Sequence, residues 1–382
     1  MRTFEVMPGN KAHWHLLSLL RDVDHVRRMT LADWDLTLRL ARQARLLGTI
    51  AHRVAANSVL WRLVPPEVQG HLCSALVYAD HRARMVRLEL GALASVIPSS
   101  VPVVLLKGAA YVAEAQPFAA GRLPGDVDIM VPRDRLDEVE HALLDAGWKF
   151  ESVDDYDQQY YRQWSHELPP MRYPGHALEV DLHHTITPVT SRTRADTGLL
   201  FRDVRAVTAS RYLVLSPADQ IVHAVIHLFQ DSELDVRLRD LVDIDALLRA
   251  YMQADADWCQ LATRAQCHGA SGLLAYALKY CGLWLGTPVR EVVAPPMGLA
   301  CRGMDWLMSA TMLPHDPDTV PGLKRRMGGW AAQVRYHRLR MPPGLLIRHL
   351  STKMGRQLAH AVRFRAASKV RDTGAGQRQP GG

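Results

Sequence analysis

The sequence has little cysteine and no long hydrophobic run. Its 382 residues include only five cysteines, an odd number that forms no C-x-x-C pair. A disulfide framework or a thiolate zinc site is therefore not expected, and a reducing cytoplasm suits the chain best. No uncharged apolar stretch reaches the roughly 18 residues that a spanning helix needs, and the first residues lack the apolar core of a signal peptide. We expect a cytoplasmic protein without a transmembrane segment.

Acidic residues are nearly absent from the C-terminal end of the chain. Residues 321–382 contain 14 Lys and Arg against one acid, a charge of +13, whereas 32 basic and 38 acidic residues give residues 1–320 a charge of −6. The overall charge of +7 thus describes a tail and not the folded body. We expect this tail to be partly disordered and to make weak contact with nucleic acid or another anionic surface.

The rest of the chain has the composition of a globular protein, with 48% hydrophobic and 22% charged residues. Apolar residues at three- and four-residue spacing predict helices over residues 13–100 and again from Ser216 to about 285, and short apolar runs between these regions predict strands. The predicted class is α+β, with a small mixed sheet. The expected parts are a helical N-terminal part (1–100), an α+β core (101–210), a helical part that closes a cleft (211–320) and the basic tail (321–382).

Three predicted strands bring acidic residues together. A hydrophobic strand ends at Lys107-Gly108, the strand DVDIMV covers 126–131, and LEVDLHH covers 178–184. Asp126 and Asp128 are two residues apart and share a face, where a neighbouring strand can place Asp181. A lone D-x-D usually lies on a solvated sheet face, but three clustered carboxylates with no nearby cysteine favour Mg²⁺ or Mn²⁺.

The order of these motifs resembles the DNA-polymerase-β-like nucleotidyltransferase superfamily, and is most similar to a bacterial family of uncharacterised nucleotidyltransferases. The residues that carry the resemblance are Leu106-Lys107-Gly108, Arg122, Asp126-Val127-Asp128-Ile129 with Val131, and Val180-Asp181-Leu182-His183. The resemblance extends to the start of a helix at 215–219, to His227 and to the helix at 238–244. The resemblance covers roughly residues 13–290 and leaves out the tail.

This resemblance implies transfer of a nucleoside monophosphate from an NTP, with ATP as the first candidate, to an acceptor hydroxyl with release of pyrophosphate. It implies that Asp126, Asp128 and Asp181 are both the catalytic residues and the metal ligands. The residues implied at the triphosphate are Lys107, Gly108, Arg122 and Arg239, and those implied behind the site are His183, His227 and Asp243. Ala109 stands where the superfamily usually has Ser or Gly, so the hydroxyl that would hold triphosphate oxygens is missing.

Several interpretations stay open at the level of sequence. A non-catalytic nucleotide-binding module would keep the same motifs, and a nucleic-acid-associated protein would use its basic tail. His223 and His227 have the i, i+4 spacing of zinc ligands but lack the Glu of H-E-x-x-H, so a packing or phosphate-contacting role is favoured over zinc. Arg239 and Asp243 have the same spacing and either pair on a helix surface or face the cleft. The acceptor, whether a saccharide, small molecule, peptide or protein, cannot be read from the chain.

Overall fold

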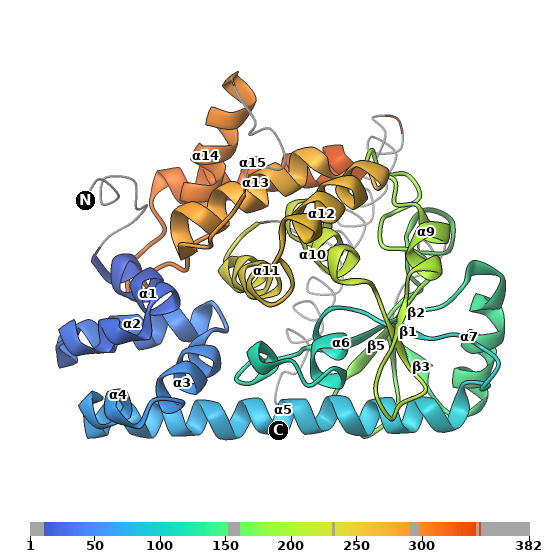
Figure 1. Cartoon of the computed structure of the whole chain (residues 1–382), viewed down its shortest axis with the longest axis horizontal. Coiled ribbons are helices and arrows are strands. Elements are labelled where there is room, and N and C mark those ends of the chain that lie inside the picture. Colours follow the sequence, from blue (N-terminus) through green and yellow to red (C-terminus); the bar gives the residue numbers. More distant parts are fainter. Residues whose placement is uncertain (1–10, 152–160, 231–233, 291–297, 341–343, 345–382) are drawn as a thin grey trace, which may run out of the picture.

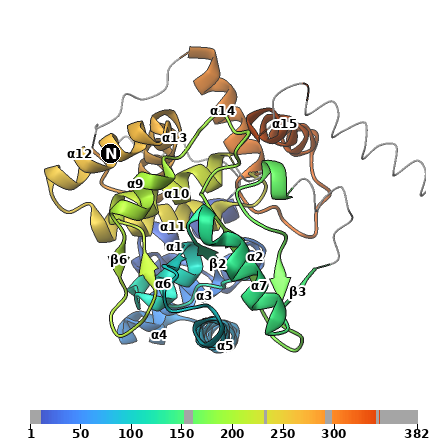
Figure 2. The same cartoon turned by 90° about the vertical axis from the view of Figure 1, so that its right-hand side faces the viewer.

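The N-terminal part is helical, as predicted. The computed structural model describes residues 11–151, 161–230, 234–290, 298–340 and 344. The first elements are α1 (Lys11–Arg21), the 3₁₀ helix η1 (Val23–Arg28), α2 (Leu31–Gln43), α3 (Leu47–Ala55), α4 (Ser58–Leu63) and α5 (Pro66–Val96). Thr30 and Asp33 form a capping box at the start of α2, and Pro66 is the first residue of α5. Helix α5 runs along the N-terminal helices and the sheet region alike (Figure 1) and is seen end-on in Figure 2.

The α+β part contains a mixed sheet of seven short strands in the order β3-β4-β5-β2-β1-β7-β6. Its elements are β1 (Val104–Leu105), α6 (Lys107–Ala113), η2 (Pro117–Ala119), β2 (Asp126–Met130), η3 (Arg133–Arg135), α7 (Leu136–Asp145), β3 (Lys149–Phe150), β4 (Met171–Arg172), β5 (Glu179–His183), α9 (Thr197–Arg202), β6 (Arg205–Ala206) and β7 (Leu213–Val214). Strands β2 and β5 are parallel neighbours, and β1 is antiparallel to β2. The predicted mixed sheet and its two acid-bearing strands, β2 and β5, are confirmed.

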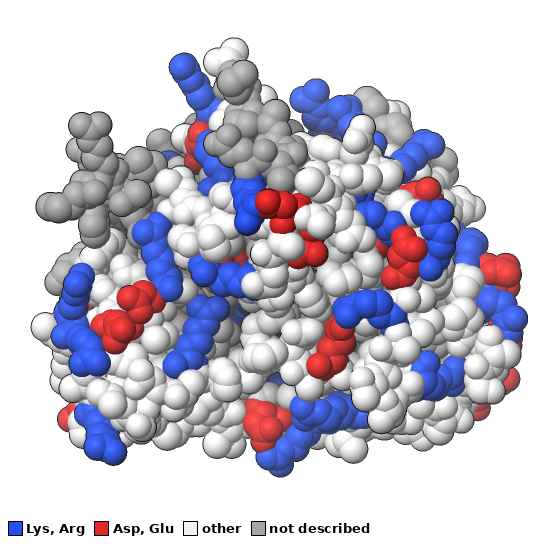
Figure 3. All heavy atoms as spheres, viewed as in Figure 1, with Lys and Arg blue, Asp and Glu red and all other residues white. Residues whose placement is uncertain are grey.

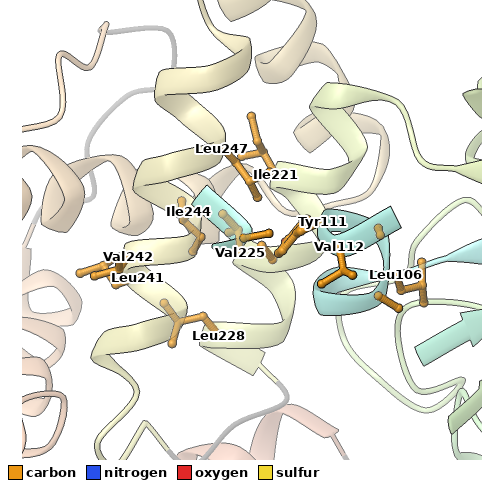
Figure 4. Close-up of a cluster of buried hydrophobic side chains, with 14 of the residues drawn as sticks. Leu106, Tyr111, Val112, Ile221, Val225, Leu228, Leu241, Val242, Ile244 and Leu247 are labelled. Atoms are coloured by element: carbon orange, nitrogen blue, oxygen red, sulfur yellow. The ribbon is translucent and has the colours of Figure 1, made fainter. Parts of the chain in front are cut away.

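The C-terminal helices pack on this sheet through α6. They are α10 (Pro217–Gln230), α11 (Leu238–Tyr251), α12 (Asp255–Cys267), α13 (Ser271–Tyr280), the short π-helical turn η4 (Cys281–Leu285), α14 (Gly298–Thr311) and α15 (Leu323–Arg340). Figure 4 shows Tyr111 and Val112 of α6 against apolar side chains of α10 and α11, and the residues labelled there are all buried. This shared core fixes the sheet relative to the helices that face it.

Part of the basic C-terminal segment is folded. Helix α15 packs on α14, where a Cβ built on Gly328 would lie 2.7 Å from that of Ala310, and Arg335 donates to the carbonyl of Phe229 on α10. Residues 345–382, which include the stretch predicted to be disordered, lie outside the described residues. Over the described part of the chain, no helix combines the length and apolarity needed to span a membrane. Acidic and basic side chains are interspersed on the face shown in Figure 3.

Candidate active site

The three predicted acids lie on adjacent parallel strands. The register of β2 and β5 sets Asp128 opposite Asp181, and Asp126 opposite Glu179. Neighbouring strands are about 4.8 Å apart, so the two strands bring these carboxylates into one group. Asp128 is buried, Asp126 is exposed and Asp181 is half-buried. Glu179 forms an ion pair with Arg172 on the neighbouring strand β4.

Asp128 is the electrostatic centre of this group. Lys107 Nζ donates to its Oδ1 at 3.2 Å, and His183 Nε2 lies 3.1 Å from the same oxygen. Burial opposes the ionisation of Asp128, but Lys107 and the hydrogen bond from His183 outweigh it and hold the pKa of Asp128 well below its usual range. Asp128 is therefore an anion at neutral pH.

The other two carboxyl groups respond to that charge. Asp128 raises the pKa of Asp126, and burial adds to the effect. Burial raises the pKa of Asp181 well above its usual range, and the charge of Asp128 raises it further. The Oδ1 atom of Asp181 is buried and has no hydrogen-bond partner among the described residues. An unsatisfied buried carboxylate oxygen beside two other carboxylates fits a bound cation, and the all-oxygen donor set fits Mg²⁺ or Mn²⁺.

Lys107 reaches Asp128 from a strained turn. The amide of Leu106 donates to the carbonyl of Asp128 at 3.0 Å, and the chain then turns into α6 with a φ of +42° at Lys107. A side chain in this left-handed region costs of order 1–3 kcal/mol, and such residues occur mostly at functional sites. Burial opposes the charge of Lys107, but Asp128 and Asp126 raise its pKa above the usual value. The turn thus places a permanent cation beside the acids.

Arg122 holds the loop that leads into β2. Its guanidinium donates through Nε to both carboxylate oxygens of Asp243 on α11, at 3.2 and 3.0 Å, and lies 5.4 Å from the ring centre of Tyr111. Arg122 is buried. The expected contact of Arg122 with phosphate stays a prediction, whereas its contact with Asp243 ties the sheet loop to α11.

Three further arginines surround the same loop, and two of them, Arg45 and Arg82, belong to no motif that the sequence analysis identifies. Arg45 Nη2 and Arg239 Nη1 donate to the carbonyl of Leu123 at 3.1 and 3.2 Å. Arg82 donates to the carbonyl of Pro124 through Nε at 2.9 Å and through Nη2 at 2.7 Å. Asp243 pairs with Arg122 instead of with Arg239, and Arg239 contacts Asp240 on its own helix at 3.3 Å. These arginines give the approach to Asp126 a positive charge that carbonyl contacts do not neutralise.

Four histidines lie near Lys107 and Asp128. Burial lowers the pKa of His223 well below its usual range and that of His227 to about 3, so both are neutral. Within the described residues this pair belongs to no group of three side chains with metal-ligand spacing. Side chains close enough together to hold one metal ion are found in another group, which consists of His166, Glu167 and His183. Sequence analysis missed His166 and Glu167 because no predicted strand included them.

Gly108 is predicted to tolerate no side chain. A Cβ built there would lie 2.3 Å from Arg122 Nη1, so Gly108→Ala forces Arg122 away from Asp243. Such overpacking costs about 1–3 kcal/mol, and we expect a lower melting temperature with weaker nucleotide binding. Gly70→Ala is the matched control, because its Cβ would meet nothing within 4 Å. Equal stability of the two variants, measured by thermal unfolding, would contradict the prediction.

Comparisons with known proteins agree with this geometry. Residues 30–286 match the family described as "Uncharacterised nucleotidyltransferase". The matched range is more than half of the chain and includes the strands that carry Asp126, Asp128 and Asp181 together with the Arg122–Asp243 pair. Neither the curated proteins nor the solved structures contain a match. On the family match, the chain belongs to the uncharacterised nucleotidyltransferase family.

Proposed function

We propose that this protein transfers a nucleoside monophosphate from an NTP to an acceptor hydroxyl with release of pyrophosphate. The observation that carries the proposal is the register of β2 and β5, which sets Asp128 opposite Asp181. One buried oxygen of Asp181 also has no hydrogen-bond partner among the described residues. Family membership supports the general reaction class. The carboxylate group supports its dependence on a divalent ion.

Asp126, Asp128 and Asp181 are the residues that would hold Mg²⁺ or Mn²⁺. Bound there, such ions stabilise the charge on the attacking and leaving oxygens of an in-line displacement at phosphorus. Lys107 keeps Asp128 ionised and fixes its orientation through the 3.2 Å contact. By the resemblance, Asp181 is the acid nearest the acceptor hydroxyl.

The basic residues divide into two roles in this proposal. Lys107, Arg239, Arg45 and Arg82 supply positive charge for the triphosphate, because phosphoryl-group transfer depends mainly on positioning and charge stabilisation. Arg122 positions the loop before Asp126 through Asp243 and acts on the nucleotide through that loop. Gly108 allows this arginine to approach α6 closely.

A catalytically inactive nucleotide-binding module is the second candidate, and one observation favours it. Ala109 occupies the position at which the superfamily usually has Ser or Gly, and its side chain is fully buried. The triphosphate therefore receives no hydroxyl from this position. Binding of NTP without any pyrophosphate release in the presence of acceptors would favour this alternative. The contact of the basic tail with anionic partners is an independent prediction of the sequence.

Thermal unfolding tests nucleotide binding directly. A ligand that binds only the folded state raises the unfolding free energy by mass action, by about 2.7 kcal/mol at a hundred times its Kd. The melting temperature rises as a result. We expect ATP or another NTP to raise it with Mg²⁺ or Mn²⁺, and to raise it much less with EDTA. No shift with any NTP at millimolar concentration would contradict the proposal. Incubation with labelled NTPs and fractionated cell extract then identifies the acceptor class.

A further inference from the structure

A second group of potential ligands lies beside Asp128, which contacts one of its members, His183. It consists of His166, Glu167 and His183, and its three ligand atoms all lie within 4.8 Å of one another. His183 has no exposed surface and His166 is 6% exposed. Asp126 and Asp181 are not part of this group. Its chemistry therefore differs from that of the three acids, since two of its three donors are imidazole nitrogens.

Backbone pairing fixes the group in place. Glu167 and His183 form an antiparallel bridge next to β5. The amide of Leu168 donates to the carbonyl of Leu182 at 2.9 Å, and that of His184 donates to the carbonyl of His166 at 3.0 Å. The residues on both sides of Glu167 and His183 are thus held by hydrogen bonds. Donor atoms presented from such a rigid frame form a site without large rearrangement.

The spacing of the donor atoms matches a metal coordination shell. Glu167 Oε2 lies 3.5 Å from His183 Nε2 and 3.6 Å from His166 Nε2. Ligands at about 2.0–2.1 Å from a tetrahedral ion are about 3.3–3.4 Å apart. Asp128 Oδ1 is 3.1 Å from His183 Nε2, so a fourth donor atom, an oxygen, is close to the same position. Since all three ligand atoms lie within 4.8 Å of one another, a local adjustment of the side chains would let them share one ion.

From this geometry, we propose that His166, Glu167 and His183 form a binding site for a divalent transition-metal ion such as Zn²⁺, Co²⁺ or Mn²⁺. Imidazole nitrogens combined with one carboxylate select such ions over Mg²⁺, which takes oxygen ligands. The ion would take the place of the proton between His183 Nε2 and Asp128 Oδ1 and would so hold these two side chains in a fixed relative position. This proposal does not depend on nucleotidyl transfer, because an inactive module would have the same site.

Cobalt binding by the full-length protein tests the site. The protein, freed of metal by a chelator and of any purification tag, is titrated with Co²⁺, which gives visible absorption when nitrogen and oxygen ligands surround it. We expect one Co²⁺ per chain, released by Zn²⁺ but not by a large excess of Mg²⁺. Absence of stoichiometric binding, or release of Co²⁺ by Mg²⁺ at a similar concentration, would overturn the proposal.

Variants locate the bound ion. His166→Gln and Glu167→Gln should each weaken Co²⁺ binding by more than about tenfold, the smallest effect expected even from loss of an outer-shell partner. His184→Gln is the matched control, since it alters a buried histidine next to His183 that is outside the group. Asp126→Asn should also keep Co²⁺ while it weakens binding of Mg²⁺-ATP. Loss of Co²⁺ in Asp126→Asn with normal binding in Glu167→Gln would place the ion among the three acids and reject the site. Circular dichroism checks that each variant is folded. If a variant is unfolded, the stoichiometry and Mg²⁺ competition of the wild-type Co²⁺ titration test the proposal.

Discussion

Replacing Asp181 by Asn should abolish nucleotidyl transfer and leave the melting temperature of the ligand-free protein unchanged or slightly higher. The carboxyl group of Asp181 has a buried oxygen with no hydrogen-bond partner in the described part of the chain, and it lies beside Asp128 and Asp126. Removal of its charge relieves repulsion in the absence of metal. It also removes a ligand of the proposed ions, and loss of one transition-state stabilising group typically costs about a hundredfold to a thousandfold in rate.

Asp128→Asn should lose activity to at least the same extent but should also lower stability. Asp128 accepts from Lys107, and its Oδ1 lies 3.1 Å from His183 Nε2. An amide in its place leaves the cation of Lys107 without its counter-charge, at a cost of about 1–3 kcal/mol. Asp128→Asn should also bind NTP more weakly than Asp181→Asn, because Asp181 is expected on the acceptor side. Repulsion among clustered carboxylates alone would predict an unchanged or higher melting temperature for either variant, and the Lys107 contact distinguishes Asp128.

Melting temperature, NTP binding and pyrophosphate release are measured in parallel on the two variants. Asp134→Asn is the control, because Asp134 is an exposed aspartate near the end of β2, and it should change none of these quantities. A destabilised Asp181→Asn protein with undiminished specific activity would show that the acids are structural. Equal melting temperatures of the two variants would show that loss of the Asp128 charge beside Lys107 does not destabilise the protein.

The parts of the site that lie on regular strands could be predicted from sequence. The alternation of Asp126 and Asp128 with apolar residues indicates strand β2, and the period of two indicates that both acids share a face. Helix capping signals likewise placed the start of α10, where Ser216 Oγ accepts from the amide of Asp219 at 3.2 Å. These features depend on neighbours along the chain, so that local patterns contain the information.

Contacts between distant segments could not be predicted in this way. The spacing of Arg239 and Asp243 leaves open a pair within one helix, but Asp243 pairs with Arg122, 121 residues away along the chain. Arg45 and Glu167 reach the site from regions with no recognisable motif. Their positions follow from how α3, the sheet and α11 pack together. Local patterning does not specify that packing, so these residues become visible only in three dimensions.

The largest loss of stability is expected from Asp219→Asn, at the start of α10. Asp219 is fully buried, and Arg264 Nε on α12 donates to its Oδ1 at 2.7 Å. Ser216 Oγ donates to Oδ2 at 2.7 Å, and His268 Nε2 lies 3.2 Å from Oδ1. The variant leaves the buried guanidinium of Arg264 without its main counter-charge. Breaking a buried pair on one side costs about 3–5 kcal/mol.

The pH dependence of this loss identifies its cause. Burial opposes ionisation of Asp219, but His268, Arg264 and Ser216 outweigh it and lower the pKa of Asp219 in the folded protein. A lowered folded-state pKa stabilises the protein above the unfolded value of about 3.9, and the contribution is lost as the pH falls through the folded pKa. The difference in unfolding free energy between wild type and Asp219→Asn should therefore be constant near neutral pH and shrink below about pH 4.

Urea unfolding from pH 7 down to pH 4 and below measures this difference, with Asp203→Asn as the matched control. Asp203 accepts from the same arginine, from Arg264 Nη1 at 2.6 Å, but its side chain is 45% exposed. Ion pairs exposed to solvent contribute about 1 kcal/mol or less, so Asp203→Asn should cost much less than Asp219→Asn. Comparable losses in the two variants would show that burial of the carboxylate is not what sets the cost. A difference that persists undiminished below pH 3 would show that the effect of Asp219→Asn comes from packing and not from the lost charge.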